Sequence, residues 1–84
     1  MEEIVHVLVF LPANRCEYEV DIPTGLNTHV AALLTAQALQ ARSEGLFVAS
    51  KSCFFSKAET GKMLNHEETI KENGILSGDS LILI

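Results

Sequence analysis

The stretch MLNHEETIKENGILSGDSLILI, residues 63–84, decides the fold of this 84-residue chain. Its last four residues, LILI, have branched apolar side chains, which are typical of a β-strand. The preceding residues 76–80, LSGDS, combine Ser, Gly and Asp and predict a tight turn into that strand. Residues 65–75 have the spacing of a turn with a short helical piece around Glu68 to Glu72. The chain is therefore predicted to finish in a strand that is reached through a series of turns.

The N-terminal part of the chain predicts a β-hairpin. Residues 3–11, EIVHVLVFL, are rich in β-branched side chains, and residues 12–14, PAN, supply turn chemistry. Residues 16–22, CEYEVDI, alternate between two kinds of side chain before Pro23 ends the strand. One face of this strand carries Cys16, Tyr18, Val20 and Ile22, and the other carries Glu17, Glu19 and Asp21. The alternation predicts a sheet with one buried face and one hydrated face.

A helix is predicted after the hairpin. Thr28 follows the turn residues TGLN and is a candidate N-cap. Residues suited to one buried face then recur at helical spacing as far as SEG at 43–45, at Val30, Leu33, Leu34, Gln37, Ala38 and Ala41. This pattern predicts one amphipathic helix of about fifteen residues across the sheet. The residues expected to be buried between helix and sheet include Leu34, Val20, Ile70 and Leu83.

The second half of the chain predicts further strands. Residues 46–50, LFVAS, are a strand candidate, and residues 62–64, KML, are a candidate for a short strand. Residues 51–62, KSCFFSKAETGK, predict either an extended loop or an extra hairpin. The resulting order, ββαββ, predicts an α+β fold of the β-grasp type, with one helix packed across a mixed four- to five-stranded sheet. We expect a single domain covering residues 1–84.

The closing stretch resembles the ubiquitin-like closing signature, in which two apolar residues, a Gly-Ile turn and a Gly-Asp turn precede an alternating final strand. The residues that match are Leu64, Ile70, Gly74, Ile75, Gly78 and Asp79. Within the ubiquitin-like superfamily, the whole chain is most similar to the small bacterial YukD/EsaB-type proteins associated with type VII (WXG100) secretion. It departs from them at residues 51–62, which form a longer segment than expected there.

This resemblance implies a non-conjugated ubiquitin-like adaptor or accessory protein that binds a protein partner in type VII secretion. Ubiquitin-type modifiers and sulfur carriers of this fold instead act through a flexible tail ending in Gly-Gly. In this chain Leu81 to Ile84 are predicted to belong to the sheet, so they do not supply such a tail. The alternative is therefore a modifier or sulfur carrier whose Gly-Gly tail is absent from this chain.

Composition and charge exclude several other classes of function. The net charge is −5, and the six Lys and Arg residues are scattered, so binding to nucleic acid is not expected. The start Met1-Glu2-Glu3 is unlike a secretion signal, and the apolar run at 4–11 is too short to cross a bilayer. Cys16 and Cys53 lack disulfide-framework or metal spacing, which suits a reducing compartment. The sequence predicts a cytoplasmic protein without direct membrane insertion.

No catalytic, metal or cofactor motif is complete. HEETI at 66–70 begins like the zinc motif H-E-x-x-H, but Ile70 stands at the second ligand position, so His66 is interpreted as a surface loop histidine. ETGKM at 59–63 lacks the first Gly of a phosphate-binding loop and has Met63 where Ser or Thr would bind magnesium, so it is interpreted as a turn. Cys53 and the three histidines have no spacing that aligns a nucleophile with a base. We expect neither a cofactor nor enzymatic activity.

The remaining function is protein binding. If His6 points outward, alternation directs Val5, Val7, Val9 and Leu11 to the helix and leaves the intervening residues of the first strand on the open face. The predicted protein-binding patch on that face consists of Leu8, Phe10, Phe47, Ile82 and Ile84. An apolar patch of this size favours docking of a partner or of a second copy of the chain. The alternative is that the segment containing Phe54 and Phe55 folds over the patch and covers it.

Overall fold

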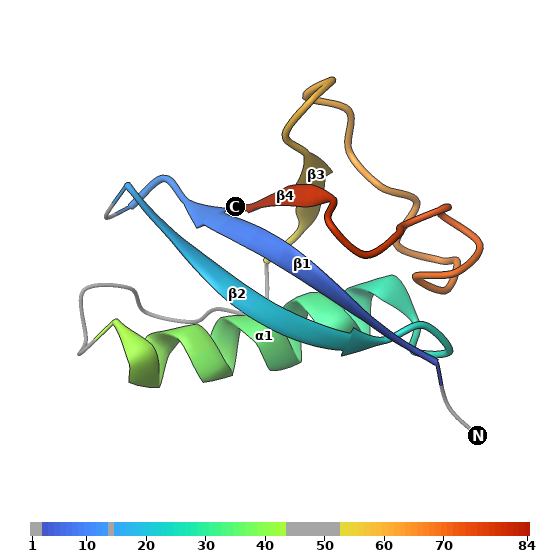
Figure 1. Ribbon diagram of the computed structural model, residues 1–84, viewed down its shortest axis with the longest axis horizontal. Coiled ribbons are helices and arrows are strands. Elements are labelled where there is room, and N and C mark those ends of the chain that lie inside the picture. The colour runs from blue at the N-terminus through green and yellow to red at the C-terminus, as the bar shows by residue number, and fades with distance from the viewer. Residues whose placement is uncertain (1–2, 14, 44–52) are drawn as a thin grey trace.

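The computed structural model describes residues 3–13, 15–43 and 53–84 (Figure 1). The elements in these residues are β1 Ile4–Leu11, β2 Cys16–Pro23, α1 Thr28–Arg42, β3 Phe55–Lys57 and β4 Ser80–Leu83. The four described strands form one sheet in the order β2-β1-β4-β3, with β1 parallel to β4 and the other neighbours antiparallel. Helix α1 crosses one face of this sheet. The predicted α+β arrangement of one helix across a mixed sheet is confirmed.

Strands β1 and β4 in the middle of the sheet have the orientation that alternation predicted. In β1, every second residue is buried, and the residues between them are exposed or half-buried. In β4, Leu81 and Leu83 are buried while Ile82 is half-buried on the opposite side. The core-facing residues of β1 are Val5, Val7, Val9 and Leu11.

Among the described strands, β2 lies at an edge of the sheet and is less completely covered. Ile22 is buried, Val20 and Tyr18 are half-buried against the core, and Cys16 is exposed. The predicted face is therefore correct, but burial decreases toward Cys16 because an edge strand has a neighbouring strand on one side only.

The N-cap of α1 is Asn27, and the prediction of Thr28 at this position is wrong. The Asn27 Oδ1 atom accepts hydrogen bonds from the backbone N–H groups of His29 at 2.9 Å and Val30 at 3.2 Å. Thr28 is the first helical residue and is fully buried. Its Oγ1 atom accepts a hydrogen bond from Asn73 Nδ2 at 2.9 Å, so its hydroxyl fixes a neighbouring turn instead of capping the helix.

The helix packs with a different face than the sequence predicted. Leu34 is 51% exposed and Val30 is 43% exposed, so the prediction that Leu34 is buried is wrong. The face of α1 that is buried carries mostly short side chains, and Leu34 lies outside that face. The residues of α1 that are buried are Thr28, Ala31, Ala32, Thr35, Ala36 and Leu39. Of the other residues expected in the core, Ile70 and Leu83 are buried and Val20 is half-buried.

The segment before the final strand forms turns around the short strand β3. The strand predicted at 46–50 lies outside the described residues, as do Lys51 and Ser52. Residues 55–63 form a small hairpin, in which Lys57 N–H donates to Lys62 O at 2.9 Å and Ser56 bridges to Met63. The strand predicted at 62–64 is therefore reduced to one bridging residue.

The short helical piece predicted around Glu68 to Glu72 is a series of turns. Thr69 and Glu72 bond reciprocally, side chain to backbone N–H, at 2.9 and 3.0 Å, which is the arrangement of a helix start. Gly74 follows with a φ of 72°, a left-handed conformation that stops a helix before it can propagate. This conformation suits glycine because it has no Cβ atom.

Candidate protein-binding face

The face of the sheet opposite α1, here called the open face, carries a continuous row of side chains across all four described strands. Strand registers place Glu17 of β2 opposite Phe10, Phe10 beside Ile82 of β4, and Ile82 opposite Ser56 of β3. Ser56 in turn bridges to Met63. Because directly paired residues point to the same side of a sheet, these five residues share the open face.

Four of the five residues predicted for the binding patch lie on this face. Leu8 is 36% exposed, Ile84 is 63% exposed, and Phe10 and Ile82 are half-buried. The fifth, Phe47, lies outside the described residues. Ile84 is joined to Phe54 by two backbone hydrogen bonds, of 2.9 and 3.0 Å, which continue the β3–β4 pairing by one residue.

Met63 belongs to the same face and was not predicted as a site residue. Its side chain is 59% exposed, and its bridge to Ser56 brings it beside the row that contains Ile82. The position of Met63 on the open face follows from its bridge to Ser56. The sequence KML contains no signal for the strand with which Met63 pairs. Ile4, at the other end of β1, is also exposed on this face.

An acidic margin borders the apolar residues along β2. Glu19 lies opposite Leu8 and Asp21 lies opposite His6, while Glu17 lies opposite Phe10. All three carboxylates are on the open face because they alternate with the core-facing residues of β2. The open face therefore combines an apolar centre with a negatively charged edge.

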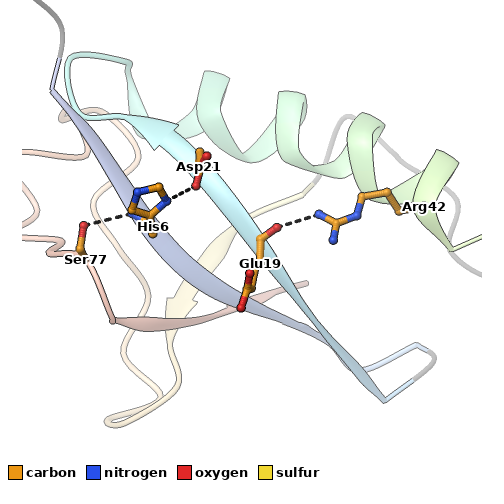
Figure 2. Close-up of polar contacts among 5 residues, drawn as sticks. All are labelled: His6, Glu19, Asp21, Arg42 and Ser77. Atoms are coloured by element: carbon orange, nitrogen blue, oxygen red, sulfur yellow. Dashed lines mark hydrogen bonds and ion pairs between the residues drawn. The ribbon is translucent and has the colours of Figure 1, made fainter.

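His6 is held between this acidic margin and the last turn of the chain, as Figure 2 shows. Its Nδ1 atom contacts the Asp21 carboxylate, and its backbone N–H donates to Ser77 Oγ at 3.1 Å. The backbone N–H of Gly78 donates to His6 O at 2.8 Å. The side chains of His6 and Asp21 are 75% and 62% exposed, so the contact orients the imidazole more than it stabilises the fold.

A shallow depression of about 290 Å³ opens beside His6 on this face. Its walls combine the aliphatic side chain of Leu8 with the carboxylates of Glu19 and Asp21 and the backbone of Gly78.

The two phenylalanines that were considered as a cover do not lie over the patch. Phe55 is fully buried in the core opposite Leu83. The Phe54 ring stacks on His29 of α1 with 5.8 Å between ring centroids and meets His66 edge-on at 5.0 Å. The Phe55 side chain is therefore engaged in the core, and the Phe54 ring is engaged with His29 and His66.

His66 lies in a loop, as the sequence predicted, but it is half-buried and both of its ring nitrogens bond to the backbone. Its Nε2 atom accepts a hydrogen bond from Phe55 N–H at 2.9 Å, and its Nδ1 atom bonds to Leu64 O at 2.8 Å. Burial lowers the pKa of His66; the Leu64 hydrogen bond opposes this effect, and the neighbouring His29 adds to it. Because both ring nitrogens bond to the backbone, His66 is not arranged as a metal ligand.

The other motifs considered for catalysis are also structural. The sequence ETGKM forms a turn, as predicted, in which Gly61 has a φ of 71° and its N–H donates to Lys57 O at 2.7 Å. In the described ranges, no three His, Cys, Asp or Glu side chains gather in a way that could hold a metal ion. The one helix seen in those ranges is too short and too polar to cross a bilayer.

Comparison with known proteins supports the fold. No family model matches the sequence, and no curated protein is significantly similar to it. The structure is similar to the ubiquitin-like domain of the type VII secretion protein EccD1 of Mycobacterium tuberculosis, with a TM-score of 0.75 and 13% identity over 98% of both chains. It is also similar to the EccD5 ubiquitin-like domain of Mycobacterium xenopi, with a TM-score of 0.80 and 16% identity over 98% of this chain and 93% of that one.

A third similar structure is a chain of the ESX-5 inner membrane complex, with a TM-score of 0.80 and 15% identity. The match covers 96% of the present chain but only 20% of that larger one. Identities this low show the fold alone, which is ubiquitin-like. These similar structures from secretion systems are EccD domains, and the narrower YukD/EsaB assignment stays a prediction.

Proposed function

We propose that this chain is a ubiquitin-like adaptor or accessory domain that binds a protein of a bacterial type VII secretion machine through its open face. The observation that carries the proposal is the apolar row of Phe10 and Ile82, flanked by exposed Leu8, Ile84 and Met63. Soluble domains rarely keep so many neighbouring apolar side chains in water unless a partner covers them. The binding role is therefore assigned to the side of the sheet that α1 leaves open.

The composition of the open face defines the partner. Apolar side chains of the partner would pack on Phe10, Ile82 and Leu8, because an interface centre is mostly apolar and excludes water. Lysine or arginine side chains at the rim would lie opposite Glu17 and Glu19 of β2. Such rim charges affect association rate and specificity more than affinity. The partner is therefore a protein surface with an apolar centre and a basic margin.

The link to secretion rests on the similar structures. Two of them are ubiquitin-like domains of EccD proteins of type VII secretion systems, and one is part of the ESX-5 inner membrane complex. We propose that the similarity in fold extends to a similar role in secretion. The proposal includes a role of the YukD/EsaB type, a cytoplasmic location and the absence of catalytic activity. A second copy of the chain remains an alternative occupant of the open face.

The test is affinity purification from the native host with wild-type protein and two open-face variants, Leu8→Glu and Ile82→Lys. Bound proteins are identified by mass spectrometry, and folding of each variant is checked by circular dichroism. Both variants should stay folded and lose the partner, because binding would desolvate an unpaired charge at the centre of the contact. The matched control is Val30→Glu, which places a charge on an exposed apolar residue of α1 and should retain the partner.

Two outcomes would contradict the proposal. Recovery of all wild-type partners by folded Leu8→Glu and Ile82→Lys proteins would show that the open face is not the binding surface. Partners that lose contact with these variants but have no connection to a secretion machine would confirm the surface and refute the proposed process.

A further inference from the structure

The imidazole ring of His66 bridges two backbone groups of the hairpin that contains β3. Leu64 N–H donates to Phe55 O at 3.1 Å, as in a pair of antiparallel strands. On the other side of this pair the ring lies between the two backbones. Phe55 N–H donates to His66 Nε2 at 2.9 Å, and His66 Nδ1 bonds to Leu64 O at 2.8 Å. Two bonds through the ring therefore stand in place of one direct backbone hydrogen bond.

The two partners of the ring determine where its proton lies. A backbone N–H group can only donate, so His66 Nε2 carries a lone pair and no proton. A carbonyl oxygen can only accept, so Nδ1 carries the proton. Both bonds form together only when the ring is neutral. A second proton, on Nε2, would point at Phe55 N–H, and two donors would then face each other.

The surroundings of His66 do not favour a charged ring. The Phe54 ring meets it edge-on at 5.0 Å, and the ring of His29 in α1 lies 6.5 Å away, between ring centroids. Among the described residues, neither Glu67 and Glu68 of the same turn nor any other carboxylate forms an ion pair with His66. Burial lowers the pKa of the half-buried ring, its backbone hydrogen bond opposes this effect, and His29 adds to it.

We propose that His66 is a pH-sensitive latch, which holds the start of β3 when its ring is neutral and releases it when the ring is protonated. The release reaches the open face through Phe54, the residue before Phe55. Phe54 exchanges two backbone hydrogen bonds with Ile84, of 3.0 and 2.9 Å. The charge of one ring therefore controls the order of the open face at Ile84.

Strand β3 is the part of the sheet most easily released. It has three residues, and among the described strands it lies at an edge, beside β4 alone (Figure 1). Strands β1 and β2 are joined along all eight residues of each. Local opening begins in the elements with the weakest pairing, and the buried side chain of Phe55 limits its extent. Acid should therefore open the start of β3 and leave β1, β2 and α1 in place.

This inference concerns the free chain and does not depend on a partner or on a role in secretion. The test uses the 15N-labelled full chain and NMR at pH 8 and pH 5. At pH 8 the ring resonances of His66 should show a protonated Nδ1 and a bare Nε2, and at pH 5 both nitrogens should be protonated. This measurement establishes the charge state of the ring in the folded protein.

Amide hydrogen exchange, corrected for the intrinsic exchange rate at each pH, measures the opening. Protection of the Phe55 and Ile84 amides should fall at least tenfold between pH 8 and pH 5, because their acceptors are lost. Protection of the β1 amides that face β2 should fall less than threefold, since that pairing contains no titrating bridge. The contrast between the two sets of amides separates local release from unfolding of the whole domain.

Two matched variants assign the effect to His66. In His66→Gln the amide group can accept from Phe55 N–H and donate to Leu64 O, but it does not titrate, so protection at Phe55 should change less than threefold. His29→Gln removes the neighbouring histidine of α1 and keeps the latch, so the acid release should persist. The release should begin at a higher pH in His29→Gln, because His29 lowers the pKa of His66.

The latch would be refuted by any of three results. The first is a proton on Nε2 instead of Nδ1 of His66 at pH 8. The second is a change of protection in acid that is absent at Phe55, or that is equal at Phe55 and in β1. The third is an undiminished acid response in folded His66→Gln, which would assign it to another group. The first two results come from the wild-type protein, so they decide the question even if His66→Gln does not fold.

Discussion

The variants Leu39→Ala and Leu34→Ala test which face of α1 packs against the sheet. Leu39 is fully buried and Leu34 is 51% exposed. Truncation of a buried leucine removes its transfer free energy and leaves a cavity, so Leu39→Ala should lower the free energy of unfolding by about 2 to 5 kcal/mol. Leu34→Ala removes a side chain that is already half in water, and alanine has the higher helix propensity, so the cost should be about 1 kcal/mol or less.

These values are large enough to separate by experiment. A domain of 84 residues has a free energy of unfolding of about 4 to 13 kcal/mol, so Leu39→Ala removes a substantial fraction of it. A loss of 1 kcal/mol corresponds to roughly 4 to 8 °C in melting temperature at this size. Urea unfolding followed by circular dichroism at 222 nm gives both free energies from the same baseline. Equal destabilisation by the two variants, or a larger loss for Leu34→Ala, would refute the helix orientation described above.

Three further predictions concern a cap, a turn and a titrating group. Asn27→Ala should cost about 1 kcal/mol in urea unfolding, because two N–H groups of α1 lose their acceptor, and Asn27→Asp should restore most of it. Asn73→Ala and Asn73→Asp should both destabilise the fold in urea unfolding, because each removes the Nδ2 group that donates to Thr28 Oγ1, Asn65 O and Thr69 O at 2.8 to 3.0 Å. The aspartate should cost at least as much as the alanine, because its carboxylate would face these three oxygens. Burial lowers the pKa of His66 below its ordinary value of 6.5, so the folded state favours the neutral imidazole. This difference in pKa between the folded and unfolded states stabilises the fold above pH 6.5, and that stabilisation is lost as the pH falls below 6.5. Urea midpoints measured between pH 8 and pH 5 should show this loss in the wild type and a smaller one in His66→Gln, and an identical pH dependence of the two proteins would refute the role of His66.

The orientation of the strands in the middle of the sheet was predictable by alternation, although both of their faces are largely apolar. In β1 the single polar residue His6, between Val5 and Val7, marks the outward side, and in β4 Leu81 and Leu83 alternate with Ile82. The helix has no such marker, because its buried face consists largely of alanine and threonine. Leu34 and Val30 were assigned to the buried face by their helical spacing, whereas the structure buries Ala32 and Ala36 instead.

The site was predictable only where it follows from alternation and strand order. Leu8, Phe10 and Ile82 were placed correctly because each lies between two buried residues of its own strand. Strand β3 lies in a segment rich in turn residues, and its pairing with β4 is a tertiary contact without a local signal. Met63 depends on that pairing, so it could not be found from the sequence.

The acidic side chains of β2 oppose pairing of this strand with the same strand of a second copy. An exposed edge strand next to apolar side chains is a common route to association of identical chains. Two β2 strands placed edge to edge would bring Glu17, Glu19 and Asp21 of one copy beside the same carboxylates of the other, and like charges on neighbouring strands are destabilising. A segment carrying lysine or arginine at these positions meets the opposite situation, with attraction at each carboxylate. The same three residues therefore disfavour pairing of β2 with a second copy and favour a basic segment beside this strand.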